Sequence, residues 1–203
     1  MTRLSRAEQK EETRRRLISS AAAVFARMGF EAAPIDVIAE EAGFSRGAFY
    51  SNFESKDELF LILLNEHLDA EIETLGRAMH HIEHPEDMVA AIERRYRVLD
   101  EDNGWCLLAT EFQLYATRGG KMADEFGRIY ERYRVRLGDI IATHCERLNI
   151  KLLLSPYELG VAQIALSHGL ALQKTANRQI DRSLTARSLA ILLKGAIVQD
   201  TQR

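Results

Sequence analysis

The chain has 203 residues, of which 46% are hydrophobic, and its 27 Lys and Arg residues against 30 Asp and Glu residues give a formal net charge of −3. This length can bury a sizeable core, either in one large domain or in a small domain fused to a larger one. The N-terminus lacks the apolar segment of a secretory signal, no apolar run reaches membrane-spanning length, and Cys106 and Cys145 form no CxxC pair. We therefore predict a soluble protein of the reducing cytoplasm.

The first predicted helix runs from about Arg6 to Met28 and buries an apolar stripe composed of Leu17, Ala21, Val24, Phe25 and Met28. The first sixteen residues carry six basic side chains, among them Arg3, against three acidic ones, whereas the later part of the chain is acidic overall. A basic arm beside an acidic remainder suits a protein that touches a polyanion at one end, although a solvated helix start produces the same pattern.

Residues 29–60 have the pattern of a helix-turn-helix, the unit that places one helix in the major groove of DNA. A short helix buries Ile35, Ile38, Ala39 and Ala42, and Gly43 ends it in the left-handed conformation that glycine adopts at little cost. Ser45 is the expected N-cap of a second short helix, with Phe44 and Phe49 at the positions of a hydrophobic staple. Ser55 and Glu58 form a predicted capping box at the start of a long third helix.

Further helices are predicted over 56–79, 86–101, 105–118 and 121–148, and then from Pro156 to 174, behind a Ser155–Glu158 capping box, and over 184–198. We find no strand-like alternation long enough for a sheet, so the predicted class is all-α. The helix after Pro156 is apolar on two faces, and the last helix is similarly broad, so each needs cover on both sides. One side can pack on its own domain and the other on a second copy, although a central core helix of a monomer has the same pattern.

The chain resembles the TetR family of bacterial transcription regulators through the segments IDVIAEEAGFSRGAFYSNF from residue 35 and SKDELF from residue 55. The preceding RRRLISSAAAVFARMGF also matches, and the remainder matches the family's effector domain more loosely. The resemblance implies a DNA-binding domain over residues 1–55, an effector-binding and dimerisation domain over 56–203, and a homodimer formed by the helices at about 156–174 and 184–198. It also implies a repressor that a small-molecule effector releases from a palindromic operator, although the motif itself does not distinguish repression from activation.

The predicted DNA-contacting residues lie in and next to the second short helix, and they are Ser45, Arg46, Gly47, Ala48, Tyr50, Ser51, Asn52 and Lys56. Arg46 can donate two parallel hydrogen bonds to a guanine, or bind a phosphate, and the Ala48 methyl group can meet a thymine methyl group. Tyr50 and Asn52 carry neutral donors for phosphate oxygens, and Lys56 can share one phosphate with the helix N-terminus behind it.

Two positions depart from the family pattern before the turn. Many members have Thr or Ser where this chain has Ala33 and Pro34, so a hydroxyl contact to phosphate is lost. Asp36 would repel a phosphate if it faced DNA, and its alternative role is to interact favourably with the helix dipole. We therefore place no phosphate contact at this helix start.

The larger predicted domain has aromatic residues at helical spacing and polar residues within apolar faces. As candidate effector contacts we take Trp105, Phe112, Tyr130, His144, Gln163 and His168, each of which would otherwise pack in the core or the dimer.

Several other site types are compatible with short motifs in the chain. Residues 43–47 match G-x-S-x-G, the nucleophile elbow of α/β-hydrolases, but no strand is predicted before Ser45. His80, His81 and His84 form a possible metal site, yet Pro85 follows them and no second cluster is visible; a solvated loop explains them better. Cys106 and Cys145 lie in apolar runs typical of buried, inert thiols rather than redox sensors. We predict no catalytic residue, cofactor or metal, and keep a helical interaction module without DNA binding as the alternative.

Overall fold

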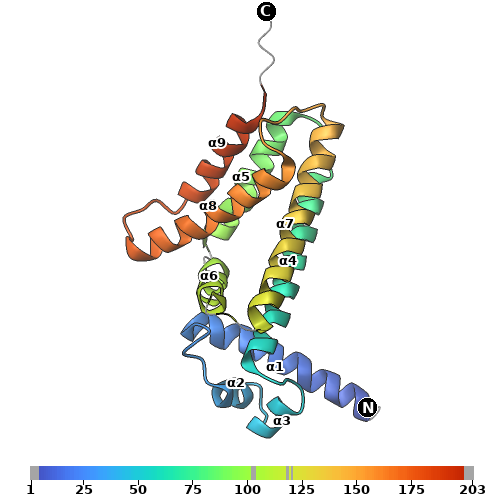
Figure 1. The fold of residues 1–203 in the computed structure, drawn as a ribbon, viewed down its shortest axis with the longest axis vertical. Helices are drawn as coiled ribbons and strands as arrows, with labels where there is room; N and C mark the ends of the chain where they lie inside the picture. The colour runs from blue at the N-terminus through green and yellow to red at the C-terminus, as the bar shows by residue number, and fades with distance from the viewer. Residues whose placement is uncertain (1–4, 102–103, 118, 120, 199–203) are drawn as a thin grey trace, which may run out of the picture. The chain divides into compact units, whose positions relative to one another are not determined.

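The computed structural model describes residues 5–101, 104–117, 119 and 121–198, so Arg3 of the predicted basic arm lies outside it. Within these residues the regular elements are helices (Figure 1), in the order α1 (Arg6–Met28), α2 (Ile35–Glu41), α3 (Arg46–Tyr50), α4 (Lys56–Met79), α5 (Pro85–Glu101), α6 (Gly104–Ala116), α7 (Lys121–Arg147), α8 (Pro156–Ala176) and α9 (Leu184–Ala196). The all-α prediction is confirmed, and the predicted bounds of the seven longer helices differ from these by at most two residues.

Serine caps begin α8 and α4 as predicted, but only α8 has the complete predicted capping box. At α8 the Glu158 amide donates to Ser155 Oγ over 3.2 Å, and the Ser155 amide donates to the Glu158 carboxylate over 2.8 Å. At α4 the Glu58 amide donates to Ser55 Oγ over 3.1 Å, but the Glu58 carboxylate accepts from the amide of Glu54 and not of Ser55. The predicted box at α4 is therefore formed with one partner shifted by a residue.

The helices group into two compact units. Unit 1 comprises Met1–His67 and Leu108–Phe126, and unit 2 comprises Leu68–Leu107 and Gly127–Arg203. The bounds of α4 and α6 show that each helix contributes residues to both units. The units describe packing, and the division into functional domains at residue 55 remains a prediction.

An aromatic cluster forms the core of unit 1. Phe30 packs against the rings of Phe25, Phe60 and Phe112, with centroids 5.6, 5.2 and 4.8 Å away. Phe60 also stacks on Phe112 at 4.2 Å, and all four side chains are at most 2% exposed. The prediction that Met28 is buried is wrong, because α1 ends there and the chain turns at Gly29, so that Phe30 occupies the core and Met28 is 39% exposed.

The turn after α1 is held by a carboxylate from α6. Glu111 accepts hydrogen bonds from the amides of Phe30 at 2.9 Å and Glu31 at 2.8 Å. Gly29 precedes them with φ +80°, and a Cβ atom there would lie 2.8 Å from Glu111 Oε2. Only glycine provides both the left-handed backbone and the space for the carboxylate.

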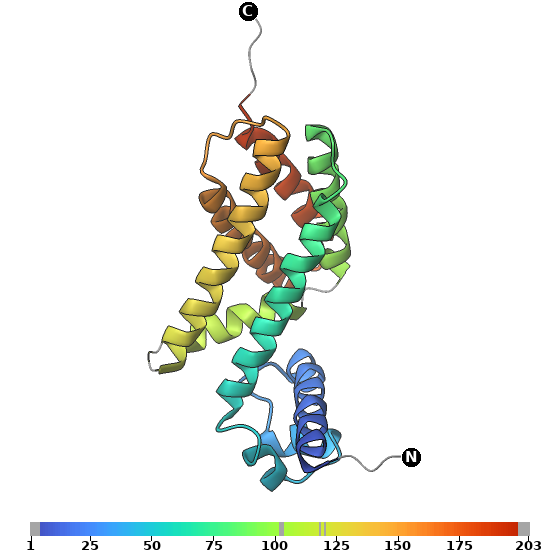
Figure 2. The ribbon, with the colours of Figure 1, turned by 90° about the vertical axis from the view of Figure 1, so that its right-hand side faces the viewer.

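Unit 2 is built from pairs of packed helices. Helix α9 packs on both α5 and α8 (Figure 1, Figure 2). Helices α4 and α7 are joined by an Arg136–Asp69 ion pair and by the His144 ring, whose Nε2 lies 2.9 Å from the Met79 carbonyl oxygen. A single isolated bridge, between Leu152 and Ile197, is the only strand-like pairing in the part of the chain that is described.

We predict that Gly29→Ala lowers the free energy of unfolding by about 1–3 kcal/mol, because alanine is strained at this φ and its methyl group meets Glu111. Gly76→Ala is the matched control, since a Cβ there meets nothing within 4 Å in the interior of α4; it should raise stability by about 0.5–1 kcal/mol. Urea unfolding followed by circular dichroism measures both. Equal effects of the two substitutions would show that Glu111 does not confine Gly29.

Candidate nucleic-acid interface

Helices α2 and α3 and the turn between them form the predicted helix-turn-helix. Gly43 has φ +79°, and its amide and that of Phe44 donate to the carbonyl oxygens of Glu40 and Ala39, both over 2.9 Å. Ser45 has extended backbone angles, and its Oγ accepts from the Ala48 amide at 3.3 Å. The predicted left-handed glycine and serine N-cap are therefore confirmed.

The pair α2–α3 is attached to α1 by polar contacts around a buried core. Ser20 Oγ donates to the Ile38 carbonyl oxygen over 2.8 Å, and Arg27 pairs with Glu41. Phe49, Ile38 and Ala39 are at most 1% exposed, which leaves the opposite side of α3 to solvent.

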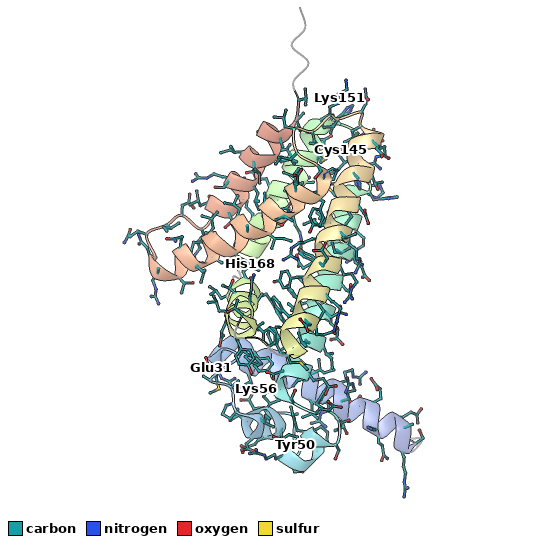
Figure 3. The ribbon with its side chains drawn as sticks, in the orientation of Figure 1. Glu31, Tyr50, Lys56, Cys145, Lys151 and His168 are labelled. Atoms are coloured by element: carbon teal, nitrogen blue, oxygen red, sulfur yellow. The ribbon has the colours of Figure 1, made fainter. Side chains whose placement is uncertain are left out.

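The predicted DNA-contacting residues divide into two groups by exposure. Ser45, Arg46, Gly47, Tyr50 and Ser51 are exposed, whereas Ala48, Asn52 and Lys56 are half-buried. Tyr50, labelled in Figure 3, is 49% exposed although it is aromatic. An exposed aromatic side chain in an otherwise polar face is compatible with a contact surface.

Arg46 forms an ion pair that the sequence does not reveal. Its Nη1 lies 2.9 Å from Asp36 Oδ2, and its Nη2 lies 3.5 Å from the Tyr50 hydroxyl oxygen. The hydrogen bond to Tyr50 and then the charge of Asp36 raise the pKa of the guanidinium. Asp36 therefore faces Arg46 and does more than interact with the dipole of α2.

Two other predicted contacts already use donors within the chain. Ser51 Oγ donates to the carbonyl oxygen of Gly47 over 2.8 Å. The side-chain amide of Asn52 donates to the carbonyl oxygen of Ala48, also over 2.8 Å. A phosphate contact by Asn52 therefore needs its second amide hydrogen or a rotation of the side chain.

Lys56 has a structural role that sequence analysis missed. Its ammonium group donates to the carbonyl oxygens of Glu31 and Ala33, both over 3.0 Å, and lies 4.7 Å from the Phe30 ring centroid. Figure 3 labels Lys56 and Glu31 in this part of unit 1. Burial lowers the pKa of Lys56, opposed by the charges of Asp57, Glu111 and Glu31. One N–H of the ammonium remains for a phosphate.

Two further residues of unit 1 fix this region and were also missed. Arg14 donates to the Asn52 carbonyl oxygen over 2.7 Å and lies over the Phe53 ring at 4.4 Å, so it anchors the end of α3. Glu111 holds the turn before α2. Neither has a local sequence signal, because each acts on a segment distant in the chain.

The surroundings of Ser45 do not match a nucleophile elbow. Helix α2 precedes the serine where that motif needs a strand, and Ser45 Oγ is engaged as the N-cap of α3.

In unit 2, three of the predicted effector residues contact one another or a further polar side chain. The Gln163 side-chain amide donates to the Tyr96 hydroxyl, and Tyr130 contacts His168 with ring centroids 6.0 Å apart. Burial raises the pKa of Tyr96 to about 12 and lowers that of His168, the latter aided by the charge of Arg134. Trp105 is half-buried in the same unit.

The other two predicted effector residues lie elsewhere. Phe112 belongs to the aromatic core of unit 1. The His144 ring lies between the carbonyl oxygens of Ile140 and Met79, at 2.7 and 2.9 Å. The six predicted residues therefore do not form one cluster, and their effector contacts remain a prediction.

An open depression of about 620 Å³ in unit 2 contains none of the six. It is lined by α7 and the loop that follows, at Ala142, Cys145, Glu146, Asn149, Ile150 and Leu152 to Pro156. Figure 3 labels Cys145 and His168 at separate places in this unit.

The described residues contain no cluster of three or more His, Cys, Asp or Glu side chains arranged to hold a metal ion. Among the helices that the structure describes, none is long and apolar enough to cross a membrane.

Helices α8 and α9 each have an apolar exposed face as well as a buried one. Leu159, Ala171 and Leu189 are at most 2% exposed, whereas Val161, Leu172 and Ile191 are 37%, 45% and 71% exposed. The two-faced pattern predicted from the sequence is thus present within unit 2.

Comparison with known proteins gives matches in the same region and in the fold. Residues 17–63 match the profile described as "Bacterial regulatory proteins, tetR family". The HTH-type transcriptional activator FasR of Mycolicibacterium smegmatis is 32% identical over 95 residues, which are 46% of this chain and 43% of FasR. The chain thus aligns with less than half of that relative.

Two solved structures match over most of the chain at low identity. FadR from Bacillus subtilis, in complex with stearoyl-CoA, has a TM-score of 0.68 at 21% identity and covers 88% of this chain and 96% of its own. SmeT, the repressor of the Stenotrophomonas maltophilia multidrug efflux pump SmeDEF, has a TM-score of 0.64 at 18% identity and covers 95% of both chains. These two likenesses show a shared fold, while the profile matches the segment that contains the helix-turn-helix. Residues 17–63 therefore carry the helix-turn-helix sequence of the TetR family of bacterial regulatory proteins, and most of the chain shares the fold of the two solved regulators.

Proposed function

We propose that this protein is a sequence-specific DNA-binding transcriptional regulator and not an enzyme. The observation that carries the proposal is the helix-turn-helix itself, in which Phe49 is buried while Arg46, Gly47 and Tyr50 lie exposed on α3. A short helix of this kind reads base edges with the exposed side chains of its first turn. In this proposal Arg46 contacts a guanine, and Tyr50 and Lys56 contact the phosphate backbone.

The regulator is proposed to act as a homodimer on an inverted repeat. The exposed faces of α8 and α9 around Val161, Leu172 and Ile191 supply the apolar surface for a second copy. Two recognition helices in such a dimer contact half-sites about 34–36 Å apart, which is one turn of DNA.

A small-molecule effector is proposed to bind in unit 2 and release the DNA, which makes the protein a repressor. Tyr96, Tyr130, Gln163 and His168 provide neutral hydrogen-bonding groups beside aromatic rings, the composition of a ligand site. A hundredfold loss of operator affinity requires about 2.7 kcal/mol of coupling between the sites. FadR with stearoyl-CoA and the repressor SmeT support this direction, whereas FasR is an activator.

Helix α6 is the proposed connection between effector and DNA. Its residues 108–116 belong to unit 1, where Glu111 binds the turn before α2, and its first residues belong to unit 2. A shift of α6 would therefore act directly on the backbone that positions the helix-turn-helix.

We expect selection from a random duplex pool to enrich an inverted repeat whose affinity falls steeply with salt, because phosphate contacts release counterions. Arg46→Ala should weaken binding about tenfold and remove the preference for one base pair per half-site. Arg187→Ala, which removes an arginine paired with Asp181 in unit 2, is the control and should leave binding unchanged. Fluorescence anisotropy at several salt concentrations gives the affinities. No enrichment together with flat salt dependence would favour the interaction module without DNA binding.

Glu111→Ala should accelerate amide hydrogen exchange at Phe30 and Glu31 about tenfold or more, because two hydrogen bonds to a charged acceptor are lost. Operator affinity should fall while the preferred bases stay the same, since Glu111 acts on the support of the recognition helix. Gln113→Ala changes an exposed residue of the same helix and should alter neither. If Phe30 and Glu31 exchange at the wild-type rate in the Glu111 variant, the proposed connection is wrong.

Ile191→Asp should convert the proposed dimer to a monomer, because a charge would be buried in the apolar interface. Leu114→Asp is the control, since Leu114 is comparably exposed, at 63% against 71%, but lies on α6. Sedimentation velocity distinguishes the two states. A dimer that persists in the Ile191 variant would place the interface elsewhere.

A further inference from the structure

The segment that carries the proposed recognition helix is acidic. From Phe30 to Lys56 the chain has two basic residues, Arg46 and Lys56, against five acidic ones, Glu31, Asp36, Glu40, Glu41 and Glu54. Lys56 is half-buried and donates to two backbone carbonyl oxygens, so Arg46 is the exposed cation of this segment. Among the residues of this segment, directional contacts of Arg46 therefore carry more of the binding than general attraction to phosphate does.

Asp36 and Tyr50 together constrain the guanidinium group of Arg46. The carboxylate accepts from Nη1 at 2.9 Å, and the Tyr50 hydroxyl lies 3.5 Å from Nη2, with the ring centroid 5.6 Å from Cζ. Both members of the ion pair are 59% exposed, so the pair is at the surface and open to a ligand. An arginine held on two sides loses less conformational freedom when it binds than an unrestrained one.

The constraint leaves enough donors for base recognition. A guanidinium group has five N–H donors, and Asp36 and Tyr50 engage one on each terminal nitrogen. Three N–H groups remain, and a bidentate contact to guanine O6 and N7 needs two of them. The Asp36 carboxylate thus engages one N–H of the Arg46 guanidinium group, while the N–H donors needed for a guanine stay available.

Asp36 also changes what Arg46 can bind. An isolated exposed arginine binds phosphate oxygens of any sequence, whereas one whose charge is offset by a carboxylate gains less from phosphate and keeps its directional hydrogen bonds. Phosphate also meets repulsion from Asp36 itself, which the neutral edge of a guanine does not.

We propose that Asp36 is a specificity-determining residue that positions Arg46 for one guanine and disfavours phosphate. This inference rests on the proposed DNA-binding function. It gives a role in recognition to Asp36, whose negative charge would otherwise be unfavourable for DNA binding.

The test compares Asp36→Ala and Asp36→Asn with Glu40→Gln, which removes an exposed carboxylate from the same helix. Each variant is titrated with the selected operator, with operators changed at the base pair whose preference Arg46→Ala removes, and with a random duplex. Both Asp36 variants should bind random duplex more tightly and lose about tenfold discrimination at that base pair. Glu40→Gln should strengthen binding to all duplexes by one common factor. Circular dichroism verifies folding, and Asp36→Asn preserves side-chain size.

The outcomes distinguish a failure of this inference about Asp36 from a failure of the proposed DNA-binding function. If the wild type binds the operator but the Asp36 variants change all affinities by one factor, Asp36 is merely a repulsive charge and the inference is wrong. If the wild type selects no sequence, the DNA-binding function fails and the inference fails with it. In the Asp36→Ala/Arg46→Ala double variant, discrimination should equal that of Arg46→Ala alone, because Asp36 acts through Arg46.

Discussion

The two hydrogen bonds that Glu111 accepts from the amides of Phe30 and Glu31 hold the turn on which the rest of unit 1 depends. Helix α1 ends at this turn, and the chain then enters the helix-turn-helix, so its geometry determines how α2 leaves the aromatic core. Gly29 has no side chain at the point where the carboxylate approaches, and Phe30 packs edge-on against the stacked rings of Phe60 and Phe112. A charged acceptor next to buried rings makes this contact costly to lose.

Much of the positive charge around the proposed DNA surface has a structural use. Arg14 donates to the backbone of Asn52, and Lys56 donates to the carbonyl oxygens of Glu31 and Ala33. The first contact joins α1 to the segment after α3, and the second joins α4 to the segment between α1 and α2. Because Arg46 is the exposed cation of the segment from Phe30 to Lys56, the geometry of the Arg46–Asp36 pair gains importance in that segment relative to general attraction to a polyanion.

Unit 2 separates buried polar groups from exposed apolar ones. Tyr96 and Gln163 hydrogen-bond in its interior, while Val161, Leu172 and Ile191 face outward on α8 and α9. The proposed effector site would use the first group, and the proposed dimer interface would use the second.

Local sequence signals determined the helices, the turn at Gly43 and the serine caps at Ser45 and Ser155, because these depend on residues within a few positions of one another. The aromatic and apolar spacing also identified Phe49 and the two-faced helix α8. Only the tertiary structure decided that Asp36 pairs with Arg46, that Lys56 binds carbonyl oxygens, and that Phe112 belongs to unit 1 rather than with Tyr130. The role of Glu111 could not be predicted from the sequence. Its partners lie 80 and 81 residues away, and the spacing of residues along the chain does not indicate which distant backbone amides a carboxylate will bind.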